Sequence, residues 1–309
     1  GTVLWSHELP EIQRFNMPRD SSNWAANRKH LFAALNNECW KWNAGTGKLE
    51  GRIAIPEQSV SSASLDWSYL SPHHDRIIGS SVIKDSSFTT FWGGGSAGWY
   101  DAKSGEVTQK VCSENLFAID SKTGLLVWIY QDGLIVNSTI TLANDLAWFV
   151  EARHISLKSK KKRQLGGSLF WKEQYLTCLD LKNGEHLWSK PLKIVPGEVV
   201  LYLAHGDGKL VLVSSGSASY NTYTFNDKDG EVLWSRKIPW PQDHHGGHMA
   251  RPAIAGGTLY IRPSALSLES GETLKIQMPG GGCGTYAASE NALFFRSGNV
   301  TMWDREKGK

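Results

Sequence analysis

One short phrase recurs along this chain: an acidic or amide residue, three further residues, a glycine and then, four positions on, a tryptophan. The three fullest copies read DSKTGLLVW, DLKNGEHLW and NDKDGEVLW, over 120–128, 180–188 and 226–234. Looser copies surround Gly47, Gly105 and Gly271. A phrase repeated at intervals of about 40 residues is typical of stacked copies of one structural unit. The repeat therefore constrains the fold more than any other feature.

Each copy predicts two β-strands joined by a tight turn. β-Favouring apolar residues occupy 116–119 and 125–130, and the polar stretch Ser-Lys-Thr-Gly lies between them. Gly124 suits the end of the turn because glycine adopts positive φ without strain, and the Asp120 carboxylate can hydrogen-bond the turn backbone. With 14 Trp in 309 residues, we expect the recurrent tryptophan to fill the space between neighbouring sheets.

The spacing of the turn glycines predicts an all-β chain, a β-propeller of four-stranded antiparallel blades. A blade of this kind takes about 40 to 45 residues, so the intervals favour six blades, with seven as the alternative. We expect one propeller domain over 1–309. Two longer intervals predict insertions, at about 85–113 and 155–168.

The two ends of the chain together make one further copy of the phrase. The segment 301–309 supplies the first half with Asp304 and Gly308, and 1–9 supplies the second half with Gly1 and Trp5. We expect N- and C-terminal strands to pair and close the ring, which removes an exposed sheet edge. The same split predicts that the chain is a segment of a longer protein.

Composition narrows the choice of partners. The chain has 33 basic and 30 acidic residues and a net charge of +3, which does not favour a nucleic-acid partner. No apolar run is long enough to cross a bilayer. We also expect the protein to be a monomer. The four cysteines, Cys39, Cys112, Cys178 and Cys283, show no paired spacing, so their disulfide state stays open. Cys178 lies within a predicted strand, where we expect a buried thiol.

The copies LFAIDSKTGLLVWIY and YLTCLDLKNGEHLWSK resemble the repeats of pyrroloquinoline-quinone-type (PQQ-like) propellers over essentially the whole chain. The stretches GWYDAKSGEVTQKVCSENLFAID and HHGGHMARP resemble uncharacterised bacterial propellers. That superfamily contains quinoprotein alcohol dehydrogenases and non-enzymatic relatives, among them a lipoprotein of the bacterial outer-membrane barrel-assembly machinery. The resemblance implies a propeller and favours a periplasmic or extracytoplasmic location. It does not select one activity, because one scaffold hosts both catalysts and binding platforms.

The enzymes of the superfamily imply a direct comparison. They hold the quinone on the propeller axis between a tryptophan and a disulfide of two adjacent cysteines, with a calcium ion and a catalytic aspartate. This sequence has no adjacent cysteine pair, and no calcium-binding set or catalytic aspartate can be placed by motif. We therefore assign no catalytic residue and no cofactor, and we expect a non-catalytic binding or scaffold domain. The alternative is an alcohol or sugar dehydrogenase-like enzyme using PQQ with calcium, or a transition metal, on the axis.

A histidine-rich stretch is the densest group of candidate metal ligands. His244, His245 and His248 follow a predicted strand, and a flexible Gly-Gly pair would let two imidazoles face one ion. Cys283, in a glycine-rich stretch, could add a soft ligand. The alternative is a polar loop whose histidines cap turns, with a free cysteine in a tight turn. For the pair His73-His74 we expect a turn role.

Other candidates lie in the two insertions. Trp92, Trp99 and Tyr100 could line a carbohydrate or peptide site, although we favour their packing the insertion onto the ring. The basic run 158–163 could meet an anionic surface, but in an insertion loop we expect it to be solvated. A protein or small-molecule ligand is therefore expected at the channel mouth or at the insertions.

Overall fold

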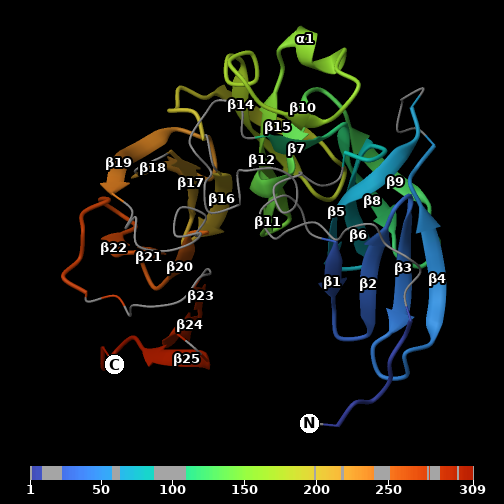
Figure 1. Ribbon diagram of the computed structural model, residues 1–309, viewed down its shortest axis with the longest axis horizontal. Coiled ribbons are helices and arrows are strands. Elements are labelled where there is room, and N and C mark those ends of the chain that lie inside the picture. Colours follow the sequence, from blue (N-terminus) through green and yellow to red (C-terminus); the bar gives the residue numbers. More distant parts are fainter. Residues whose placement is uncertain are drawn as a thin grey trace, which may run out of the picture. The chain divides into compact units, whose positions relative to one another are not determined.

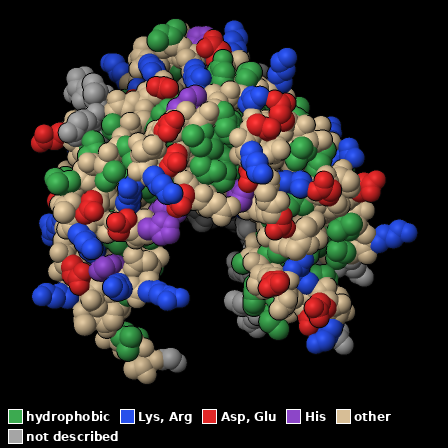
Figure 2. Space-filling view, turned by 180° about the vertical axis from the view of Figure 1, so that it is seen from behind, with side chains coloured by type: hydrophobic (Ala, Val, Ile, Leu, Met, Phe, Trp, Pro, Cys, Tyr) green, Lys and Arg blue, Asp and Glu red, His purple; other side chains and the backbone are tan. Residues whose placement is uncertain are grey.

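The structure, a computed structural model, describes residues 2–8, 23–57, 63–86, 109–197, 200–216, 219–239, 251–276, 278, 286–297 and 299–308. Strands dominate these residues, and the helical elements described are one short α-helix, α1 (Ile155–Lys158), and one 3-10 turn, η2 (Asn137–Thr139). The prediction of an all-β chain is confirmed. No described helix is long and apolar enough to span a membrane. Basic and acidic side chains are interspersed on the face drawn in Figure 2, in keeping with the small net charge.

The chain divides into two compact units. The first contains the described residues up to Ser86, then 109–138 and 145–187, and the second contains 139–144 and the described residues from Trp188 onward. Consecutive strands pair antiparallel in most sheets, as the sequence of colours in Figure 1 shows. Ring closure between the terminal strands, the count of six or seven blades and the single domain stay predictions.

The first unit holds two whole sheets and most of a third. The first sheet consists, in order, of β1 (Trp24–Ala26), β2 (His30–Leu35), β3 (Glu38–Asn43) and β4 (Leu49–Ala54). The second consists of β5 (Leu65–His73), β6 (Arg76–Ile83), β8 (Asn115–Asp120) and β9 (Leu126–Tyr130). The third runs in the order β13 (Gln164–Leu165), β7 (Lys110–Ser113), β10 (Leu134–Val136), β12 (Leu146–Ala152), β14 (Gln174–Asp180) and β15 (His186–Pro191).

The second unit holds one four-stranded antiparallel sheet and two three-stranded antiparallel sheets. One sheet consists of β16 (Val200–Gly206), β17 (Lys209–Ser215), β18 (Ser219–Asn226) and β19 (Val232–Pro239). The next two are β20 (Ala253–Ala255), β21 (Thr258–Ile261) and β22 (Ser264–Ser267), then β23 (Ala287–Ala288), β24 (Ala292–Ser297) and β25 (Asn299–Asp304). Strand β11 (Thr141–Ala143) also belongs to this unit, and Thr141 Oγ1 donates to the Leu203 carbonyl at 2.9 Å.

The three fullest copies of the phrase each form the predicted hairpin, β8–β9, β14–β15 and β18–β19. Asp120 ends β8, and its carboxylate accepts hydrogen bonds from the backbone N–H groups of Lys122 and Thr123 at 3.0 and 2.7 Å. These bonds, those from Thr123 foremost, lower the pKa of Asp120. Gly124 then closes the turn with φ +73° and donates its N–H to the Asp120 carbonyl at 2.9 Å. The aspartate and the glycine therefore have the local roles that the sequence indicated.

The recurrent tryptophan packs against the turn of the following copy. A Cβ added to the turn glycine would lie 2.6 to 2.7 Å from the indole at each of four contacts: Gly47 on Trp5, Gly184 on Trp128, Gly230 on Trp188 and Gly271 on Trp234. In three of them the indole N–H also donates to the carbonyl three residues before that glycine: Ala44 at 2.9 Å, Leu181 at 2.9 Å and Leu268 at 3.0 Å. The expected space-filling role is confirmed, and the glycine is required because the ring leaves no room for a side chain.

One position lacks the tryptophan. Gly51 pairs with Lys41 in the register in which Trp128 pairs with Ala118, so it occupies the tryptophan position of the first sheet. Among the described residues, no atom lies within 4 Å of a Cβ added to Gly124. The Lys41 amine instead donates to the Ser121 carbonyl at 3.2 Å, the position that an indole N–H takes elsewhere. A lysine thus retains the hydrogen bond of the contact without the packing.

Three of the cysteines, Cys39, Cys112 and Cys178, are buried and carry a thiol rather than a disulfide. The buried position of Cys178 within β14 is as expected, and burial raises the pKa of the Cys39 thiol to about 12. A thiol this far from ionising is unreactive at neutral pH, so Cys39 has a packing role.

Candidate functional site

The candidate residues that the sequence singled out lie outside the described residues. These are His244, His245, His248 and Cys283, proposed as metal ligands, and Trp92, Trp99 and Tyr100, proposed as ligand-binding aromatics. Their roles stay predictions. Within the described residues, two other clusters carry chemistry, and the hairpin turns of the sheets position the first of them.

Main-chain hydrogen bonds join the two hairpin turns at the same end of a sheet. In the third sheet, the Leu181 N–H of the phrase donates to the Asp145 carbonyl of the turn before β12, at 2.8 Å. In the second sheet, Ser121 donates in the same way to Asp75 at 2.8 Å. These bonds hold the turn after β5 and the turn before β12 at the end of the sheet where the turn of the repeated phrase lies.

Two histidines and one aspartate meet between these turns. The Nε2 atoms of His73 and His74 lie 2.9 and 3.1 Å from Oδ1 of Asp145. The imidazole rings contact each other edge-on, with centroids 4.4 Å apart. His74 has φ 53° and Asp145 φ 61°, so both side chains extend from left-handed backbone that such residues adopt infrequently. The cluster is therefore held by turn geometry as well as by its own hydrogen bonds.

The surroundings leave the cluster open on one side. A pocket of about 280 Å³ is lined by His73, His74, Asp75, Arg76, Asp145, Leu181 and Lys182. The Arg76 guanidinium is bound to the Leu181 carbonyl at 2.9 Å and to the Lys182 carbonyl. Hydrogen bonds from His73 and then His74 lower the pKa of Asp145, so its carboxylate is ionised at neutral pH. The cluster thus presents an anionic oxygen and two imidazoles to an open pocket.

The His73-His74 pair does form a turn, as expected, because β5 ends at His73 and β6 begins at Arg76. Its contact with Asp145 was not expected, since the two segments are 72 residues apart in the chain. No local motif marks Asp145, which follows an asparagine in an ordinary polar turn. Only the pairing of neighbouring sheets brings this carboxylate to the histidines.

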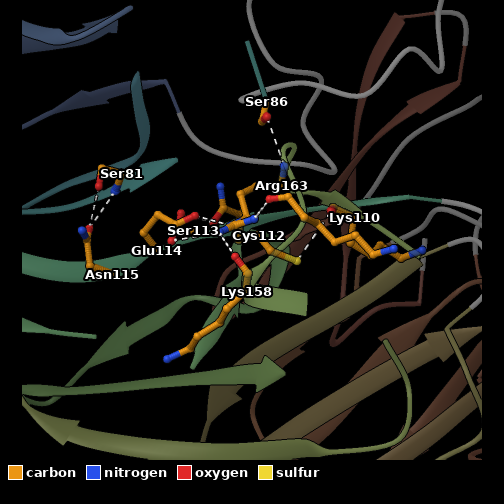
Figure 3. Close-up of polar contacts among 11 residues, drawn as sticks. Ser81, Ser86, Lys110, Cys112, Ser113, Glu114, Asn115, Lys158 and Arg163 are labelled. Carbon is orange, nitrogen blue, oxygen red and sulfur yellow. Dashed lines mark hydrogen bonds and ion pairs between the residues drawn. The ribbon is translucent and has the colours of Figure 1, made fainter. Parts of the chain in front are cut away.

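The second cluster anchors the insertion at 155–168. The buried Arg163 side chain pairs with both Glu114 oxygens through Nε and, at 3.4 Å, Nη2 (Figure 3). The same guanidinium donates to the Lys158 carbonyl at 3.1 Å and to the Lys160 carbonyl. Its backbone N–H donates to Ser86 Oγ at 3.1 Å.

The expectation that the whole run 158–163 is solvated is therefore wrong for Arg163, which is 4% exposed. Lys160, Lys161 and Lys162 are exposed as expected. The difference arises because Glu114, which follows β7, supplies a carboxylate that the local sequence does not reveal. We call residues 155–165, which hold α1, the lysines and β13, the insertion platform.

Replacing Arg163 by methionine should release the insertion platform. Loss of its charged hydrogen bonds is expected to lower the free energy of unfolding by about 1–3 kcal/mol, because Glu114 remains partly accessible to water. Limited proteolysis should cut the variant within 155–168 at protease levels that leave the wild type intact. The matched control is Lys161→Met, an exposed change expected to stay within about 0.5 kcal/mol. Equal protease resistance of the three proteins would contradict the anchoring role.

The sheets and their phrase turns define the class of protein: an all-β repeat protein with the four-stranded antiparallel blades of a β-propeller. A sequence model of a PQQ-like repeat family, described as "Outer membrane protein assembly factor BamB", matches residues 165–309. The phrase also recurs before residue 165, at 120–128. Residues 165–309 thus match the PQQ-like repeat family that the sequence resemblance implied.

Several solved structures are similar to this chain at low sequence identity. BamB from Moraxella catarrhalis is 13% identical, with 92% of this chain and 84% of that chain covered and a TM-score of 0.44. A europium-containing methanol dehydrogenase is 10% identical, with 92% and 74% covered and a TM-score of 0.45. Quinohemoprotein alcohol dehydrogenase from Comamonas testosteroni is 11% identical, with 89% and 43% covered and a TM-score of 0.43. No curated protein sequence matches the chain significantly.

Proposed function

We propose that this propeller is a non-catalytic binding domain and that the insertion platform is its docking surface for a protein partner. The observation that carries the proposal is the anchoring of a charged loop on a rigid sheet. The buried Arg163 is ion-paired with Glu114 and holds the loop on the sheet. Strand β13 pairs with β7, so that Gln164 lies opposite Val111 and Leu165 opposite Lys110. A loop held in one conformation binds a partner with less loss of conformational entropy than a mobile one.

The surface of the platform favours an acidic partner. Lys160, Lys161 and Lys162 are exposed together, and Ile155 at the start of α1 is 76% exposed. Opposite charge steers association, while an apolar side chain adds contact area that excludes water. The matching ligand is an acidic polypeptide segment that also carries large apolar side chains. This complementarity supports a protein rather than a nucleic acid as the partner.

The test uses a synthetic 12-residue peptide in which Asp and Glu alternate with Leu, read by fluorescence anisotropy against the full chain. We expect saturable binding that weakens with added salt, and at least a tenfold loss of affinity, about 1.4 kcal/mol, in Lys160→Glu/Lys161→Glu/Lys162→Glu. The control, Lys48→Glu/Lys122→Glu/Lys228→Glu, makes the same change in net charge at three exposed turn lysines. Equal losses in the two variants would mean that the net charge, not the platform, binds the peptide.

A second measurement addresses catalysis. PQQ and calcium are added to the purified chain, which is followed by absorbance and by dye-linked oxidation of alcohols and sugars. The binding role predicts no turnover under these conditions. Saturable quinone binding with turnover would overturn the proposed function and establish the oxidoreductase alternative.

A further inference from the structure

We propose that His73, His74 and Asp145 form a binding site for a divalent transition-metal ion. All three residues belong to the first unit, and they are distinct from the histidines at 244–248. One ligand atom from each residue can be chosen so that all three lie within 4.8 Å of one another. Two imidazole nitrogens with one carboxylate oxygen are a donor set that first-row metals bind readily, with water completing the coordination.

The spacing of the ligand atoms fits such an ion. Cis ligands of an octahedral ion with bonds of about 2.1 Å lie about 3.0 Å apart. The two Nε2 atoms lie 2.9 and 3.1 Å from Asp145 Oδ1. An ion can therefore take the place of the hydrogen bonds with small side-chain rotations. The Nε2 protons that now point at the carboxylate must leave or move to Nδ1, because a coordinating nitrogen needs its lone pair.

The charge and accessibility of the cluster favour the same ligand. Asp145 supplies one negative charge, and the Lys182 amine lies 4.0 Å from its Oδ2. The His74 side chain is 72% exposed, and the pocket beside it opens to solvent. An ion can thus enter and retain bound water. Because two of the three donors are nitrogen, the site selects copper, nickel or zinc over calcium and magnesium, which prefer oxygen.

The turns hold the ligands in place before an ion arrives. The Leu181 N–H binds the Asp145 carbonyl, and the Leu181 carbonyl accepts from Arg76 Nη1 and from Trp128 Nε1, each at 2.9 Å. The phrase turn of the third sheet is therefore tied both to the ligand Asp145 and to the sheet that carries the two histidines. Such outer hydrogen bonds orient metal ligands and raise affinity.

The experiment uses the full chain without an affinity tag, in a His244→Ala/His245→Ala/His248→Ala background that removes the other candidate ligands. Copper(II) and nickel(II) are titrated by calorimetry, and the copper complex is examined by electron paramagnetic resonance. We expect one ion per chain, with hyperfine splitting from two imidazole nitrogens. His73→Gln, His74→Gln and Asp145→Asn should each lower the affinity at least about 100-fold. Calcium should not compete.

A matched control comes from the second unit. His205 Nε2 lies 2.9 Å from Asp227 Oδ2, a histidine–carboxylate pair of the same length with one histidine instead of two. His205→Gln should leave metal binding unchanged. Asp145→Asn retains an oxygen that accepts from both histidines, so thermal unfolding should show this variant folded. Absence of a bound ion, a copper spectrum without nitrogen splitting, or equal affinity in folded Asp145→Asn would each overturn the proposal.

Discussion

Replacing Arg153 by methionine is expected to lower the free energy of unfolding by about 3–5 kcal/mol, because it leaves a buried carboxylate without its cation. The Glu151 side chain has no solvent exposure, and its Oε1 binds Arg153 Nε at 2.8 Å and also Nη2. Burial lowers the pKa of Arg153, but the charge and hydrogen bond of Glu151, together with Tyr130, outweigh this and raise the pKa overall. Denaturant unfolding of the single variant and the wild type measures the loss.

Two hydroxyls complete the cluster around Glu151. Tyr130 and Thr177 each donate to Oε1 at 2.9 Å, while Oε2 has no hydrogen-bond partner among the described residues. Burial, followed by the Glu151 charge, raises the pKa of Tyr130, so its phenol remains a donor at neutral pH. Removing the cation therefore leaves two hydrogen bonds to a charge that water cannot reach. Neither compensates for the lost ion pair.

A double variant separates the buried charge from the lost contacts. Glu151→Gln/Arg153→Met keeps an oxygen that accepts from both hydroxyls but removes both charges. We expect it to recover at least half of the stability lost in Arg153→Met, because neutral groups cost less to bury than an unpaired charge. If the double variant is as unstable as the single one, the loss comes from packing of Arg153 on Tyr175, where the guanidinium lies 4.3 Å from the ring centroid.

Gly184→Ala should lower the free energy of unfolding by about 2–5 kcal/mol. The residue has φ +74°, and a left-handed backbone costs a residue with a side chain about 1–2 kcal/mol. The added Cβ would also lie 2.7 Å from Cδ2 of Trp128. Overpacking of this kind costs about 1–3 kcal/mol of stability. Trp128 is buried and donates to the turn, so it cannot move aside freely. Chemical denaturation followed by tryptophan fluorescence gives the value.

Gly124→Ala is the matched control for this contact. Gly124 occupies the same position of the phrase with φ +73°, but among the described residues nothing lies within 4 Å of its added Cβ. We expect a loss of about 1–2 kcal/mol, which is the backbone strain alone. The difference between the two variants measures the packing of tryptophan on the turn. Equal losses would show that the indole contact adds nothing to the role of the glycine.

The hairpins could be predicted because their determinants are local. An aspartate that binds the next turn, a glycine with positive φ and a tryptophan four residues later lie within nine residues of one another, as Asp120, Gly124 and Trp128 do. Their spacing indicated both the strands and a wedge between sheets. The turn on which each wedge packs was not predictable, since it belongs to another copy, as Gly184 does for Trp128.

The sequence by itself determined the repeat unit, the all-β class and the resemblance to PQQ-like propellers. Tertiary structure alone decided which polar residues meet. The sequence predicted that Arg163 is part of a solvated basic run, but in the structure it is ion-paired with Glu114. For His73 and His74 the sequence predicted only a turn, but in the structure both lie within 3.1 Å of Asp145 from the neighbouring sheet. The physical reason is that side-chain chemistry at these clusters depends on contacts between segments that lie far apart in the chain. A local pattern encodes the strand that carries a residue, but not the residue that faces it.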